Sequence, residues 1–231
     1  MRLAADDALV DSGLAARLQR AFGRDTGVAV QLIRGPATTV LEALERGEHD
    51  AALTNAPEVE SALDKQGLIH DRHHVASTDF LLVGPSALAK PLDANNNIAL
   101  ALSRLAQVQA LFITRDDGSG THLAEHALWR AAQVAPAAPW YMKIAPGEAL
   151  LAQARSRNAC ALVERGVWAA QGGGKGYGVL VEGDPKLAAQ VHVMRSFRVN
   201  HPSAKLFVSW VAGKLGRRAA GSVPGYRAPP R

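Results

Sequence analysis

The chain has little cysteine, few aromatic residues and no long apolar run. Its single cysteine, Cys160, excludes an internal disulfide and a cysteine-based zinc cluster within the 231 residues. Aromatic residues make up 5% of the chain and do not alternate with basic ones, which argues against a stacking surface for single-stranded nucleic acid. No run approaches the roughly 18 apolar residues that a membrane-spanning helix needs. We therefore expect no nucleic-acid partner and no membrane span.

The beginning of the chain and its charge give two further expectations. The first residues, MRLAADDALV, place two aspartates where a secretory signal peptide has its apolar core, so we expect no signal peptide in this chain. A mature extracytoplasmic domain would look the same. The formal net charge of +5 is spread along the sequence and favours anionic partners in general.

The order of the elements predicts an α/β fold. Helical periodicity at residues 12–22, 38–46, 99–110, 119–132, 147–156 and 202–215 alternates with strand-like runs at 28–33, 50–53, 80–83, 111–114, 160–163, 177–181 and 192–199. Such alternation is typical of largely parallel sheets. The elements fall into two groups, which predicts a first lobe of residues 1–84, a second lobe of residues 85–190 and a return to the first lobe over 191–231. We expect a small ligand in the cleft between the lobes.

One stretch, TRDDGSGTH at residues 114–122, has two candidate functions. As an anion site it would combine the free amides at a helix start with the Arg115 guanidinium and the hydroxyls of Ser119 and Thr121. A purely structural alternative makes Ser119 the helix N-cap and pairs Arg115 with Asp116 or Asp117. The spacing alone leaves both open.

The same helix carries a possible metal motif. Residues 122–126 read HLAEH and match H-x-x-E-H, which sets His122 and His126 on one helical face with Glu125 between them as a general base. A zinc hydrolase would need a third ligand, for which Glu164 and Glu182 are the candidates. A second histidine group, HDRHH at residues 70–74, is interpreted as a polar loop.

The sequence also resembles a known family over nearly its whole length. FITRDDGSGTHLAEHALWRAAQV, WYMKIAPGEAL, ALVERGVW and VNHPSAKLFVSWV, with DSGLAARLQRAFGRDTGVAV and STDFLLVGP before them, are similar to the tungstate-binding proteins of ABC transporters. That resemblance implies the two-lobed periplasmic binding fold of type II, a Venus flytrap that closes on its ligand. It implies an extracytoplasmic monomer in the periplasm or at the cell surface, which passes a tungstate- or molybdate-like oxyanion to a permease. It implies neither catalysis nor a cofactor.

The resemblance further implies which residues bind the ligand. Arg115, Ser119, Gly120 and Thr121 match the family's element in the second lobe. In the first lobe the family's hydroxyl-rich turn corresponds to residues 5–8, where Asp6 and Asp7 replace threonines. Thr38 and Thr39 follow an altered glycine turn and would complete the site.

Two carboxylates beside a dianion are unfavourable because like charges repel strongly in a cleft of low dielectric. Three alternatives follow. Asp6 and Asp7 point away from the ligand, one of them is protonated and donates a hydrogen bond, or the ligand is a different, cationic or zwitterionic solute. The third would make the protein a sensor or a diverged receptor on the same fold.

Overall fold

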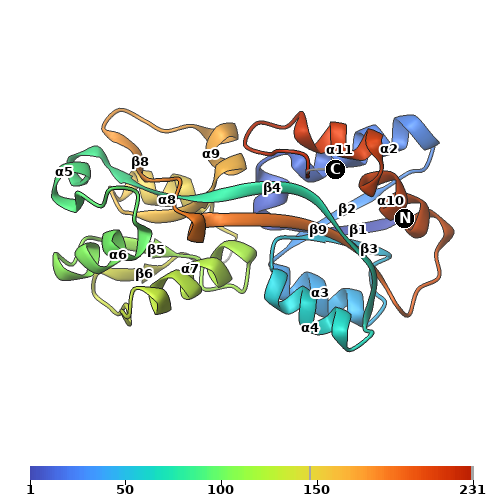
Figure 1. The fold of residues 1–231 in the computed structure, drawn as a ribbon, viewed down its shortest axis with the longest axis horizontal. Helices are drawn as coiled ribbons and strands as arrows, with labels where there is room; N and C mark the ends of the chain where they lie inside the picture. Colours follow the sequence, from blue (N-terminus) through green and yellow to red (C-terminus); the bar gives the residue numbers. More distant parts are fainter. Residues whose placement is uncertain (146, 230–231) are drawn as a thin grey trace.

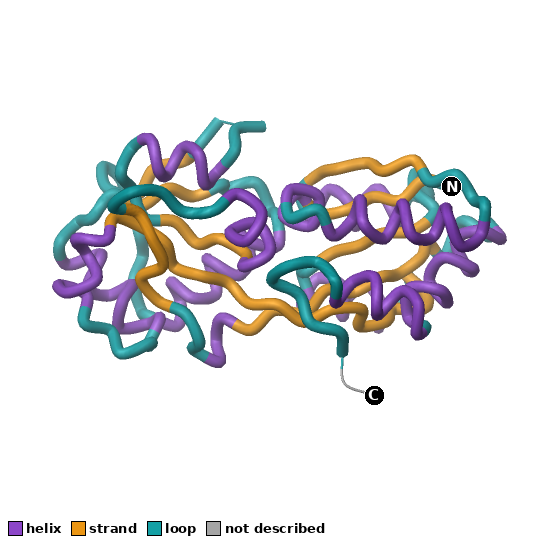
Figure 2. Tube along the Cα trace, turned by 90° about the horizontal axis from the view of Figure 1, so that it is seen from above, coloured by secondary structure: helices purple, strands orange, loops and turns teal. Residues whose placement is uncertain are grey.

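The computed structural model describes residues 1–145 and 147–229 and shows two α/β lobes side by side (Figure 1). Two long strands, β4 (Ile69–Pro85) and β9 (Ala188–Ser196), run lengthwise through both lobes. They pair with each other in antiparallel orientation. Seen from above, these strands are continuous across the narrow region between the lobes (Figure 2). The hinge of the molecule is therefore a two-stranded ribbon.

The first lobe is built from both ends of the chain. It contains β1 (Arg2–Asp6), α1 (Asp7–Asp11), α2 (Leu14–Thr26), β2 (Gln31–Gly35), α3 (Ala37–Glu45), β3 (Ala51–Thr54), α4 (Pro57–Lys65), α10 (Pro202–Ala212) and α11 (Lys214–Gly221). Its core includes Phe22 and Phe207, whose rings meet edge to face with centroids 5.0 Å apart. Ala4 and Ala5 point to opposite faces of β1 and are both fully buried, because helices cover both faces of the strand.

The second lobe contains the middle of the chain. Its elements are η1 (Ser86–Leu88), α5 (Ala89–Leu92), α6 (Ile98–Gln107), β5 (Phe112–Thr114), α7 (Gly120–Ala131), β6 (Tyr141–Lys143), α8 (Leu150–Ser156), β7 (Ala161–Glu164), α9 (Arg165–Gln171), β8 (Tyr177–Val181) and η2 (Pro185–Leu187). Phe112, Trp129 and Tyr141 pack together in its core. None of the helices among the described residues is long and apolar enough to cross a membrane.

The sheet is mixed, which corrects the prediction of largely parallel strands. Its order is β2-β1-β3-β9-β4-β7, with β8 also paired to β4. Only β1 with β2 and β1 with β3 are parallel in this sheet, because the ribbon of β4 and β9 returns the chain between the lobes in antiparallel fashion. The predicted polar loop at residues 70–74 is wrong for the same reason, since these residues belong to β4.

Most predicted helices and strands are present with shifted ends, and the α/β class is confirmed. The lobe boundaries stay a prediction. Side chains of β4 pack in both lobes, with Val75 and Ala76 in the core of the first and Phe80 and Leu82 in the core of the second. The chain therefore passes between the lobes within this strand.

Candidate functional site

The candidate site lies where the first lobe meets the beginning of α7. The parallel strands β1 and β3 both end here, so the turn after β1 and Asn55 after β3 come together at one edge of the sheet. From the second lobe, the loop of residues 115–119 and the first turn of α7 face them. The fit is close, because a Cβ added to Gly120 would lie 1.7 Å from Asn55 Oδ1. Only glycine allows this approach.

Asp6 joins the two lobes through its carboxylate. One oxygen accepts a hydrogen bond from the Ala8 backbone amide at 3.0 Å and so caps α1. The other accepts from the Gly120 amide at 2.9 Å, at the positive end of α7. The side chain is fully buried. Burial raises its pKa from 3.8 to about 6, although the two amides and Arg115 oppose that rise.

Asp7 and Arg115 form a second link between the lobes. The Arg115 guanidinium donates to Asp117 at 2.9 Å and to Asp7 at 3.5 Å. Asp7 also accepts from Arg34 at 2.8 Å. Arg34 in turn pairs with Asp11 at 3.1 Å, so two guanidinium groups serve three carboxylates in this chain of ion pairs.

The Ser-Gly-Thr element begins α7 as the sequence predicts. Ser119 is the N-cap, and its hydroxyl accepts from the His122 amide at 3.3 Å. Its own amide donates to Asp117 at 2.9 Å. The structural alternative for this stretch is therefore present: Ser119 caps the helix and Arg115 pairs with Asp117. The anion interpretation survives beside it, because the Gly120 amide holds the carboxylate of Asp6.

The two threonines of α3 separate in the structure. The Thr38 amide donates to the Gly118 carbonyl at 3.1 Å across the lobes. A Cβ on Gly118 would lie 2.2 Å from the Thr38 hydroxyl, so this is a second close contact that needs glycine. Thr39 lies exposed on α3, away from these contacts. The structure thus brings together Asp6, Asp7, Thr38, Arg115, Ser119 and Gly120, and leaves Thr39 outside.

Glu164 is a site residue that the sequence analysis weighed only as a zinc ligand. Its carboxylate accepts from Asn55 at 2.6 Å across the lobes and from the Tyr226 hydroxyl. It is 1% exposed, and burial raises its pKa from 4.5 to about 7, with a further rise from the neighbouring charge of Asp6. Its only sequence signal is an acid at the end of an apolar run, ALVE, in which a buried carboxylate must find partners.

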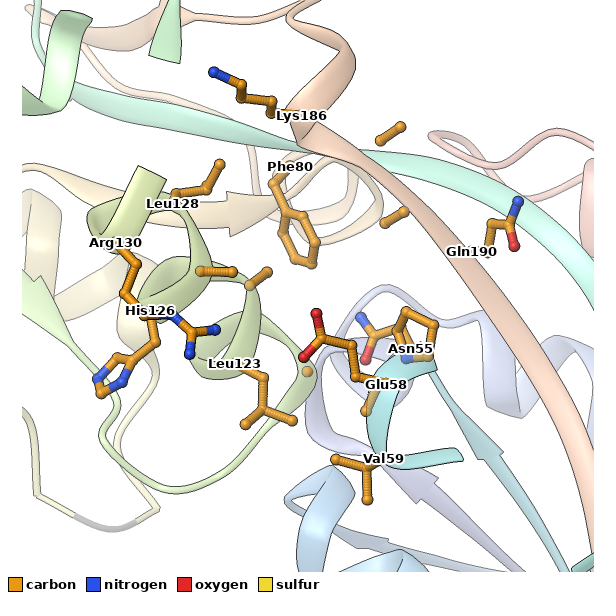
Figure 3. A pocket seen from close by; sticks show the side chains of 17 residues that line it. Asn55, Glu58, Val59, Phe80, Leu123, His126, Leu128, Arg130, Lys186 and Gln190 are labelled. Atoms are coloured by element: carbon orange, nitrogen blue, oxygen red, sulfur yellow. The ribbon is translucent and has the colours of Figure 1, made fainter. Parts of the chain in front are cut away.

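Two cavities flank this contact between the lobes. A small one of about 20 Å³ is lined by Ala8, Arg115, Thr121, Leu150 and Glu164, among others. It has room for about one water molecule. On the other side lies a groove of about 590 Å³ between α4, α7 and β9, where Phe80, Leu123 and Val59 point into the space (Figure 3). Arg115 lines the smaller cavity, whereas Arg130 and Lys186 line the larger groove.

Comparison with known protein families and sequences assigns the chain to a family. A family model of the PBP superfamily domain matches residues 4–214. The chain belongs to the PBP superfamily. The tungstate-binding protein of Peptoclostridium acidaminophilum is 28% identical over 227 residues, which are 95% of this chain and 79% of that protein.

Solved structures give the same result. The structure described as the tungstate ABC transporter from Geobacter sulfurreducens superposes with a TM-score of 0.81 at 28% identity and covers 96% of this chain and 97% of its own. The tungstate-binding protein from Desulfovibrio alaskensis G20 superposes with a TM-score of 0.77 at 25% identity, covering 100% and 99%. The resemblance and the type II fold expected from the sequence are confirmed. The relatives are binding proteins rather than enzymes.

The structure speaks against the hydrolase alternative. Glu125 is 2% exposed and points into the second lobe, where it accepts from the Tyr141 hydroxyl at 2.6 Å and from Trp129 Nε1 at 3.2 Å. Burial raises its pKa to about 7. A general base must reach a water on the metal. The carboxylate of Glu125 is instead held in the interior of the second lobe by Tyr141 and Trp129.

Proposed function

We propose that the protein is an extracytoplasmic receptor for a small tetrahedral oxyanion of the tungstate or molybdate class, which it delivers to an ABC transporter permease. The observation that carries this proposal is the Asp6 contact. In the closed structure the α7 N-terminus already holds a negatively charged oxygen, through the Gly120 amide at 2.9 Å, and Arg115 lies beside it. Amides at a helix start next to a guanidinium suit an oxyanion in the same way. The tungstate-binding relatives supply the class of ligand.

The position of Asp6 sets a condition on binding. Its carboxylate faces the α7 N-terminus, so the alternative in which the acids point away does not hold for Asp6. The remaining cavity of about 20 Å³ is too small for a tetrahedral oxyanion. In our proposal the lobes open along β4 and β9, the anion enters, and Asp6 gives up the Gly120 amide or becomes protonated.

Arg115 supplies the positive charge in this proposal. Replacing Arg115 by Ala removes the cationic fork and leaves Asp7 without its cross-lobe partner. We expect tungstate affinity to fall at least about 100-fold, which corresponds to about 3 kcal/mol, the upper part of the range for a hydrogen bond to a charged group. Arg157→Ala is the control, because Arg157 is exposed on the second lobe.

Calorimetric titration of both variants and the wild type with tungstate, molybdate, sulfate and phosphate tests the proposal. One-to-one binding by the wild type and by Arg157→Ala, with loss in Arg115→Ala, is the expected result. The absence of heat with all four anions would contradict the oxyanion function and favour a different solute. Equal affinity of Arg115→Ala and the wild type would remove Arg115 from the site.

A further inference from the structure

Three potential metal ligands meet on the surface of the second lobe, at the beginning of α7. They are Asp116, His122 and His126, and one ligand atom from each lies within 4.8 Å of the others. The two histidines are one helical turn apart on the same face of α7. Asp116 comes from the preceding loop, where its positive φ of 50° is a conformation that aspartate tolerates better than most residues.

The distances suit a tetrahedral ion. The Nε2 atoms of His122 and His126 are 2.9 Å apart, and His122 Nε2 is 3.4 Å from Asp116 Oδ1. Ligand bonds of about 2.1 Å at tetrahedral angles place neighbouring ligand atoms about 3.4 Å apart. The two distances from His122 Nε2 are therefore within about half an ångström of that spacing, and the third pair of ligand atoms lies within 4.8 Å.

The surroundings of the group leave ligand atoms open to an ion. Lys143 pairs with the second oxygen of Asp116, Oδ2, and leaves Oδ1 facing the histidines. His126 is exposed, so an ion can reach the group from solvent.

We propose that Asp116, His122 and His126 bind one divalent transition-metal ion, with Zn²⁺ as the reference ion. Two imidazoles and one carboxylate select Zn²⁺, Co²⁺, Ni²⁺ or Cu²⁺ over Mg²⁺ and Ca²⁺, which prefer an all-oxygen shell. Three protein ligands leave the fourth position to water. The site binds a metal without hydrolytic chemistry, because Glu125 is sealed in the core by Tyr141 and Trp129.

Metal binding alters the loop that carries Arg115. The Gly118 amide donates to His122 Nδ1 at 3.0 Å, which places the ring proton of neutral His122 on Nε2. Coordination at Nε2 moves that proton to Nδ1, so the Gly118 amide must turn away. The same residue accepts from the Thr38 amide of the first lobe. Metal binding should thus shift Gly118 and, through it, the hydrogen bond between the lobes.

Calorimetric titration of untagged, chelator-treated protein with ZnCl₂ tests the site, with MgCl₂ as the comparison. We expect one Zn²⁺ per chain and no comparable Mg²⁺ binding. His126→Gln is the main variant, because His126 is exposed and we expect the fold to tolerate its loss. It should lower the affinity for Zn²⁺ at least about tenfold, and Asp116→Asn should also lower that affinity. His73→Gln, at an exposed position of β4, is the matched control and should bind like the wild type.

A second readout reports the geometry. Co²⁺ in a site with two imidazoles and a carboxylate gives visible absorption of tetrahedral type, which His126→Gln should abolish. Failure of the wild type to bind stoichiometric Zn²⁺ would overturn the proposal. So would unchanged affinity in both His126→Gln and Asp116→Asn, or an equal loss in His73→Gln, which would place the ion on β4.

Discussion

Replacing Asp6 by Asn probes the proposed oxyanion site most directly. The substitution keeps the size of the side chain and one oxygen acceptor, which serves one of the two amides of Ala8 and Gly120; it puts an NH2 group in place of the second oxygen and removes the negative charge. Since burial raises the pKa of Asp6 to about 6, the carboxylate is mostly ionised at neutral pH. Of the two routes proposed above, we expect a dianion at the same amides to bind with uptake of a proton by Asp6, because two like charges there repel each other.

The size of the effect follows from that pKa. Above about pH 6 each further pH unit costs about 1.4 kcal/mol of binding free energy, so wild-type affinity should fall roughly 80-fold between about pH 6.5 and about pH 8.5. Below about pH 6 the affinity should level off. Asp6→Asn should show almost no pH dependence over this range. Near pH 7.5 it should bind up to about 30-fold more tightly than the wild type, a difference of about 2 kcal/mol.

Titration with micromolar tungstate at several pH values, in buffers of different ionisation heat, measures both affinity and proton uptake. The wild type should take up about one proton per anion well above the pKa of Asp6, and Asp6→Asn none. Asp64→Asn, at an exposed position of α4, is the control and should match the wild type. A flat wild-type profile, or the same slope in Asp6→Asn, would refute the reasoning.

Two further substitutions test the contact between the lobes. Gly120→Ala places a Cβ against Asn55 and should prevent closure of the lobes, lowering tungstate affinity at least about 100-fold. Gly174→Ala is the control and should bind normally, because the nearest neighbour of its added Cβ would be 4.0 Å away. Small-angle scattering that showed a fully closed Gly120→Ala variant would contradict this prediction. Because the folded pKa of Glu164 is raised from 4.5 to about 7, its contribution to stability is complete below about pH 4.5 and is lost as the pH rises through 7. Urea titrations at several pH values should therefore show that Glu164→Gln reduces, by up to about 3 kcal/mol, the loss of unfolding free energy between pH 4.5 and 7. The same loss of unfolding free energy in the variant and the wild type would refute the raised pKa of Glu164.

Much of the fold was predictable because periodicity reports burial locally. The helices at α2, α6 and α7 have apolar residues at helical spacing, and Asn97 and Ser119 mark two starts as N-caps. The course of β4 was missed over its first half, because a strand of a two-stranded hinge exposes many residues and keeps no apolar alternation there. The antiparallel pairing of β4 with β9 joins segments more than 100 residues apart, and no local pattern encodes it.

The site divides in the same way. The order of residues alone determined that Ser119 begins a helix, that Arg115 precedes it and that His122 and His126 share a helical face, because these are properties of one turn and one helix. Only the tertiary structure decided that Asp6 reaches the Gly120 amide, that Glu164 meets Asn55, and that Asp116 completes the histidine pair. The first two contacts depend on how the two lobes meet around a shared ribbon, and the third on how the loop before α7 folds back onto that helix. Closure also decides the charge of the site, since burial raises the pKa of Asp6 and Glu164 toward neutrality.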